Sequence, residues 1–180
     1  MKKLSFLTGL IILLLFGATT YFSSCVHDAC VARNVTCKNN GTCRDGDCIC
    51  PSGYEGDSCQ FRVNQKFAGY YKCIRTGFIN DTIHDDNDDS LCIRANNDKF
   101  GITLFSIRDS VLFVYKGTAN DNFITVPEQV IVDTSYTPDL PYTVSGSGSL
   151  NGEVVTLTLH TTWPFGNKSK MTYAGTRYQK

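Results

Sequence analysis

Cysteine is the residue type whose number and spacing most constrain the chemistry of this chain. The sequence contains nine cysteines, and seven of them lie between Cys25 and Cys59. Such a density favours disulfides in an oxidising compartment over cytosolic thiol chemistry. Spaced Cys-x-x-Cys knuckles are missing from this segment, so we predict no metal site in it.

Other residue types that could do chemistry are too scattered to form a recognisable site. The three histidines, His27, His84 and His160, share no metal-ligand spacing. Residues 146–149 lack the spacing of a nucleophile elbow, and residues 166–169 lack the context of a phosphate loop. We therefore predict a protein that is not an enzyme and that uses no cofactor.

Positive and negative residues are balanced over the whole chain, but acidic residues are concentrated in one run. Lys plus Arg equals Asp plus Glu at 17 each, so no overall field favours nucleic acid. The dense run is His-Asp-Asp-Asn-Asp-Asp at residues 84–89. An EF-hand loop beginning at Asp85 would need Gly and Glu where Ser90 and Asn96 stand. We expect this run to lie in a solvated loop.

The N-terminal residues 1–24 have the order of a secretory signal: two lysines, an apolar stretch and a small polar end. The following Ser23-Ser24-Cys25 resembles the lipobox of bacterial lipoproteins. That resemblance implies that Cys25 is acylated with palmitate-type chains, with residues 25–29 as a lipidated tether. Without Cys25 the cysteine count is even. An ordinary cleaved signal and an uncleaved anchor are the alternatives.

The residue after Cys25 bears on location. It is Val26, so the aspartate that retains such lipoproteins at the inner membrane is missing. The resemblance therefore implies an exported protein anchored to the bacterial outer membrane, facing either the periplasm or the cell surface.

Residues 30–59 hold six cysteines and end in Cys-x-Cys-x-x-Gly-Tyr-x-Gly-x-x-Cys. Spacing alone selects none of the fifteen pairings that six cysteines allow. The ending resembles the EGF-like family, which implies the disulfides Cys30–Cys43, Cys37–Cys48 and Cys50–Cys59. Asp28 alone fits the calcium-binding variant of that family. A rigid spacer and a dedicated recognition surface remain alternative roles for this module.

After a predicted linker at residues 60–66, residues 67–180 have the alternating texture of an all-β domain. The clearest hairpin runs from Tyr142 to His160 around the turn Asn151-Gly152. Further strands are expected at residues 67–75, 90–95, 100–107, 111–116, 122–126, 129–132 and 171–178. The fold class is mainly β: an EGF-like module followed by an antiparallel barrel or sandwich.

Cys73 and Cys92 fall on the first two of these strands, on either side of a loop expected at residues 76–89, so we predict a cross-strand disulfide. Residues 67–71, with a Gly-x-aromatic pattern, and Arg177 near the end resemble the calycin, or lipocalin-like, pattern. That resemblance implies that the two segments pack across the closed end of a barrel.

The leading functional hypothesis is a non-enzymatic binding or adhesion lipoprotein, held on the membrane by its lipid, with a protein or glycan partner. The alternative is a lipocalin-like carrier or sensor of a small apolar ligand. The expected contact surface combines the acidic run with an aromatic loop: Asp85, Asp86, Asp88, Asp89, Trp163 and Phe165. Packing of Trp163 over an open barrel mouth is the other interpretation of that loop.

Acylation of Cys25 is directly testable. Radiolabelled palmitate should enter the wild-type protein and should not enter Cys25→Ala, because the thioether needs the cysteine sulfur. Equal labelling of the two proteins would show that Cys25 is not the acylation site.

Overall fold

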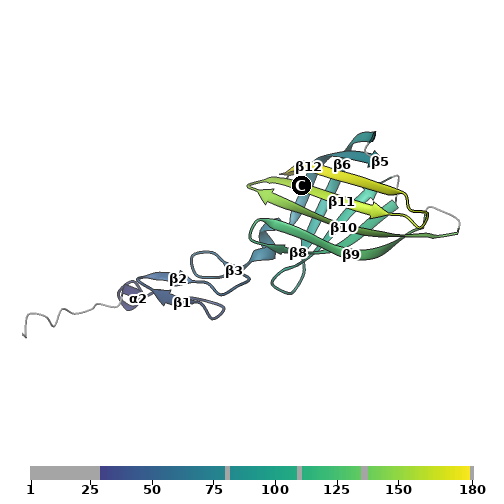
Figure 1. The fold of residues 1–180 in the computed structure, drawn as a ribbon. Helices are drawn as coiled ribbons and strands as arrows, with labels where there is room; N and C mark the ends of the chain where they lie inside the picture. Colours follow the sequence, from purple (N-terminus) through teal and green to yellow (C-terminus); the bar gives the residue numbers. More distant parts are fainter. Residues whose placement is uncertain (1–28, 80–81, 109–110, 135–137, 179–180) are drawn as a thin grey trace, which may run out of the picture.

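The structure is a computed structural model that describes residues 29–79, 82–108, 111–134 and 138–178. Cys25, Asp28 and the predicted signal peptide lie outside the described residues. Within the described part of the chain, no helix is long and apolar enough to cross a membrane. Figure 1 shows a small disulfide-rich module that projects from one end of a β-barrel.

The small module contains short elements stapled by disulfides. Its elements are α2 (Ala29–Ala32), β1 (Thr42–Arg44), β2 (Asp47–Ile49), β3 (Tyr54–Glu55) and β4 (Phe61–Arg62). The disulfides are Cys30–Cys43, Cys37–Cys48 and Cys50–Cys59, the pairing that the EGF-like resemblance implies. Asp45 and Gly46 have φ of 54° and 92° in the turn between β1 and β2, as a tight hairpin turn of this kind requires.

The second domain is a closed antiparallel barrel of eight strands and not a sandwich. The strands are β5 (Gly69–Ile79), β6 (Thr82–Ala95), β7 (Gly101–Arg108), β8 (Val111–Asn120), β9 (Phe123–Asp133), β10 (Leu140–Asn151), β11 (Val154–Thr162) and β12 (Lys168–Tyr178). They follow one another around the barrel in chain order, and β12 pairs with β5 to close it. Closure leaves no open sheet edge at the first and last strands.

The β10–β11 hairpin forms where its sequence pattern predicts, but its two turn residues are Gly152 and Glu153 and not Asn151 and Gly152, because Asn151 still pairs with Val154. Gly152 has a φ of 59° in the turn, and Leu150 pairs with Val155 beside it. Alternate side chains of the two strands point into the barrel, following the two-residue period of a strand. The buried members are Tyr142, Val144, Leu150, Val155, Leu157, Leu159 and Thr161.

The stretch predicted as a linker, residues 60–66, is structured. β4 pairs with β3 of the EGF-like module, and the 3-10 helix η1 (Val63–Phe67) follows it directly. Val63, Asn64 and Phe67 are buried, and Phe67 belongs to the barrel core. The connection between the domains is therefore a packed junction.

Asn64 holds η1 against the barrel. Its side-chain Nδ2 donates to the carbonyl oxygens of Asp98 at 2.9 Å and Gly101 at 2.8 Å, and it lies 3.3 Å from that of Asn96. The carbonyls of Asn96 and Asp98 belong to the segment that joins β6 to β7, and Gly101 is the first residue of β7. The buried amide therefore ties η1 to the backbone at the start of β7, and its hydrogen bond to Gly101 is completely buried.

The loop expected at residues 76–89 is not present, because β5 continues to Ile79 and β6 begins at Thr82. The acidic run therefore lies on a strand. Among the described residues, the 82–90 stretch pairs only with β5, since pairing of β6 with β7 begins at Leu91. Charged residues are well tolerated on a strand that has one unpaired edge.

The predicted disulfide between Cys73 and Cys92 is wrong, since both cysteines are free. Cys73 pairs with Asp89, whereas Cys92 pairs with Tyr70, three positions along the ladder. An odd offset puts the two side chains on opposite faces of the sheet. Cys73 lies inside the barrel at 2% exposure, and Cys92 lies half-buried on the outer face.

Removal of the Asn64 amide should destabilise the barrel. We expect Asn64→Ala to lower the free energy of unfolding by about 1 to 3 kcal/mol, because the hydrogen bonds from this side chain to the carbonyls of Asp98 and Gly101 are lost. Urea unfolding measures the change. Asn97→Ala is the matched control, as Asn97 is exposed in the same segment; equal effects of the two substitutions would contradict this role for Asn64.

Candidate binding site

Arg177 brings the first and last strands of the barrel together at the junction. It donates from Nη2 to the carbonyl oxygen of Lys66 and, at 2.9 Å, to the hydroxyl of Tyr71. Its guanidinium also lies over the Tyr71 ring, 5.4 Å from the centroid. A Cβ at Gly69 would meet the Arg177 side chain at 3.1 Å, so glycine gives this arginine room.

Tyr71 connects Arg177 to η1 through a second hydrogen bond. Its hydroxyl donates to the carbonyl oxygen of Phe67 at 2.8 Å. Burial raises the pKa of Tyr71, and the hydrogen bond from Arg177 opposes that shift. The residues quoted for the calycin resemblance therefore lie together at the end of the barrel where the EGF-like module joins.

The barrel interior contains a charged pair formed by Arg75 and Asp89. Arg75 Nε lies 3.1 Å from Asp89 Oδ2, and both side chains are almost completely buried. Ser106 Oγ lies 3.5 Å from the same carboxylate oxygen and 3.2 Å from the hydroxyl of Tyr173. Asp89 was expected on the contact surface, and this expectation is wrong because its side chain points inward.

The other acidic residues of the predicted contact surface give little support to a binding role for it. Asp88 is exposed on β6. The side chains of Asp85 and Asp86 lie outside the part of the structure that is described. Within the described residues, no group of three or more His, Cys, Asp and Glu side chains could hold a metal ion.

The aromatic loop lies at the end of the barrel opposite the junction, between β11 and β12. Trp163 is half-buried and packs on Tyr142, with ring centroids 4.5 Å apart and an interplanar angle of 32°. This favours packing over the barrel end, the second of the two interpretations of Trp163. Phe165, by contrast, is 85% exposed at the loop tip.

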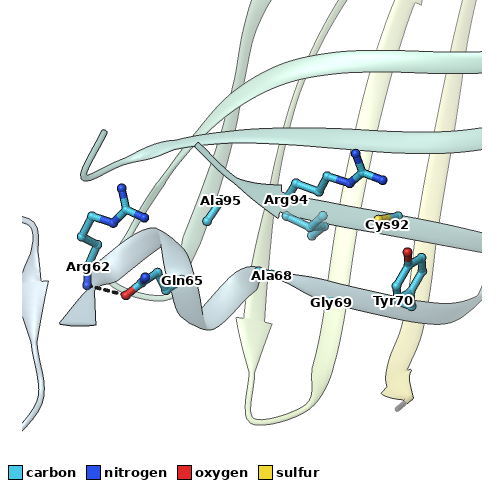
Figure 2. Close-up of a pocket in the computed structure, with 9 residues that line it drawn as sticks. Arg62, Gln65, Ala68, Gly69, Tyr70, Cys92, Arg94 and Ala95 are labelled. Atoms are coloured by element: carbon cyan, nitrogen blue, oxygen red, sulfur yellow. Dashed lines mark hydrogen bonds between the residues drawn. The ribbon is translucent and has the colours of Figure 1, made fainter. Parts of the chain in front are cut away.

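A groove of about 620 Å³ lies on the outer face beside the junction (Figure 2). It is lined by η1 with its flanking residues and by the adjoining parts of β5 and β6. The lining residues are Arg62, Gln65, Ala68, Gly69, Tyr70, Cys92, Ile93, Arg94 and Ala95. Sequence analysis missed this groove, because it treated residues 60–66 as a linker and Cys92 as half of a disulfide.

Comparisons with known proteins found a family match and a similar protein. Residues 34–62 match the family described as the Teneurin-like EGF domain. A neurogenic locus notch homolog protein of Giardia intestinalis is 25% identical over 83 residues, which is 43% of this chain and 14% of that protein. The chain contains an EGF-like domain. It spans only a small part of the length of this relative, so the likeness is limited to the aligned segment.

The buried pair in the barrel leads to a stability prediction. Arg75→Met alone or Asp89→Leu alone should each cost about 3 to 5 kcal/mol, because each change removes one member of an ion pair whose two side chains are at most 9% exposed. The double variant should be more stable than either single variant. Urea unfolding of all three proteins measures this, and additive losses in the double variant would contradict the prediction.

Proposed function

We propose that the protein is an exported, membrane-anchored binding or adhesion protein without enzymatic activity, in which the EGF-like module and the barrel present a surface to a protein partner. The disulfide-rich EGF-like domain indicates an extracellular or exported protein. EGF-like domains typically mediate protein interactions, and the likeness to a notch homolog agrees with this class of function. The lipid on Cys25 and the outer-membrane location are parts of the proposal that rest on the sequence alone.

The observation that carries the proposal is the packed junction. Asn64 and Phe67 of η1 are fully buried against the barrel, and β4, which directly precedes η1, pairs with the EGF-like β3. A membrane anchor at Cys25 would precede the EGF-like module in the chain, so this module would hold the barrel away from the bilayer. The far end of the barrel, where the loop between β11 and β12 contains Phe165, would then face outward (Figure 1).

The barrel interior favours a surface role. Large aromatic side chains occupy it, all of them at most 4% exposed: Phe67, Tyr71, Phe113, Tyr115, Tyr142 and Tyr173. Exposed apolar groups, by contrast, are concentrated at loops and outer faces, with Phe165 the most exposed of the large hydrophobic side chains among the described residues. An exposed aromatic on a loop is a common anchor of protein interfaces.

A lipocalin-like carrier is the second candidate, and a specific observation favours it. The barrel is closed by eight strands, and Arg177 packs on Tyr71 beneath η1, as the calycin resemblance implies. If this candidate is right, protein purified from its native host should release an apolar molecule on extraction with organic solvent, and mass spectrometry should detect it.

The surface proposal is tested at Phe165. Beads coated with the protein should adhere to cells that display the partner, and Phe165→Asp should reduce adhesion about tenfold or more, because truncation of an interface anchor costs at least 1 to 2 kcal/mol. Phe123→Asp is the matched control, since Phe123 is 67% exposed at the junction end of the barrel. Unchanged adhesion of Phe165→Asp would contradict this surface.

A further inference from the structure

The groove beside the junction has cationic walls. Arg62 lines one end of it, Arg94 lines another part, and none of its lining residues is acidic. Figure 2 shows Arg62 and Gln65 from the junction and Arg94 and Cys92 from β6 around the same space. The nearby carboxylate of Asp98 accepts the backbone N–H groups of Phe100 and Gly101, which lower its pKa.

Arg94 is held in place and still has its donors available. Its guanidinium stacks over the Phe105 ring, 4.8 Å from the centroid. Among the described residues it forms no ion pair. A stacked guanidinium keeps its in-plane N–H groups free, and that edge matches the two oxygens of a carboxylate.

Arg62 links the groove to the contact between the domains. Its Nη1 donates to the carbonyl oxygen of Asn97 and lies 3.4 Å from that of Asp98. On the other side of this contact, Lys99 lies over the ring of Tyr54 in the EGF-like module, 4.9 Å from the centroid. The groove is therefore continuous with an interface that both domains form.

Cys92 also lines the groove. It is two residues before Arg94 on β6, so both side chains point to the outer face. The thiol is free and half-buried, whereas the other free thiol, Cys73, is inside the barrel, where burial raises its pKa to about 11. A thiol with so high a pKa stays protonated and unreactive near neutral pH.

We propose that this groove binds an acidic peptide segment of the partner protein, with carboxylates held by Arg94 and Arg62 over the Cys92 thiol. The proposal rests on the proposed function, because it supplies the partner with a second contact site near the EGF-like module. An extended segment suits a groove that runs along two strands and reaches the interface between the domains.

Cys92 supplies a built-in reporter. Its thiolate attacks the disulfide of dithiobis(nitrobenzoic acid), forms a mixed disulfide, and displaces one thionitrobenzoate whose absorbance is measured; the thiol proton goes to solvent. This reagent carries carboxylates, whereas dithiodipyridine is neutral. Arg94→Gln should slow the anionic reagent roughly 3- to 10-fold, the lower range of electrostatic steering, and leave the neutral reagent unchanged.

The full-length protein is used, and Cys92→Ser is the blank that removes signals from other thiols. Lys170→Gln is the matched control, because Lys170 also lies over an aromatic ring on the outer face, 5.3 Å from the centroid of Phe78, but away from the groove. Equal slowing of both reagents in Arg94→Gln, or slowing of the anionic reagent in Lys170→Gln, would overturn the proposal.

Competition identifies the class of ligand. At fixed ionic strength, blocked tetraglutamate should protect Cys92 in the wild type and not in Arg94→Gln. No protection by tetraglutamate would overturn the proposal, and equal protection by acetylglutamate at the same carboxylate concentration would replace the peptide with a small carboxylate. The Phe165→Asp adhesion assay does not involve the groove. If Phe165→Asp loses adhesion and tetraglutamate does not protect Cys92, the groove proposal is contradicted and the proposed function is retained.

Discussion

The packing and hydrogen bonding of η1 against the end of the barrel are the constraint on which the arrangement of the two domains depends. Arg177 can reach the carbonyl of Lys66 only because β12 pairs with β5, which places the last strand beside the first. Asn64 then joins the same helix to the segment between β6 and β7. Barrel closure and domain docking therefore stabilise each other through one short helix.

This coupling has consequences for function. The EGF-like module contributes little apolar core of its own, with its disulfides replacing one, and it gains a packed neighbour at β4 and η1. A binding protein benefits when its contact sites are held at fixed separation, because less ordering entropy is lost on association. The exposed Phe165 and the cationic groove lie at opposite ends of the barrel and would contact different parts of a partner.

Sequence reasoning succeeded where period and family pattern were strong. The two-residue alternation around Asn151-Gly152 predicted the β10–β11 hairpin, and the EGF-like resemblance implied disulfides that the structure contains. It failed where the position of a side chain depends on the register of strand pairing. The polar composition of residues 84–89 suggested a loop, although these residues lie on β6, in a part of the strand that pairs only with β5 among the described residues and therefore tolerates charge.

Register also explains the errors at Cys73 and Asp89. These two residues pair with each other across β5 and β6, so both point into the barrel, and Cys92 points out. Nothing in composition or spacing reveals such an offset, because a shift of one residue exchanges the two faces of a strand. The junction was missed for a related reason: a helix of five residues carries too short a pattern to be recognised.

The central claim is that η1 joins the EGF-like module and the barrel into one rigid unit. Nitrogen-15 relaxation of backbone amides tests it most directly, because the ratio of longitudinal to transverse relaxation times reports the rotational tumbling of each domain. One diffusion tensor should fit the amides of both the EGF-like module and the barrel. Separate tensors, with faster tumbling of the smaller module, would contradict the claim.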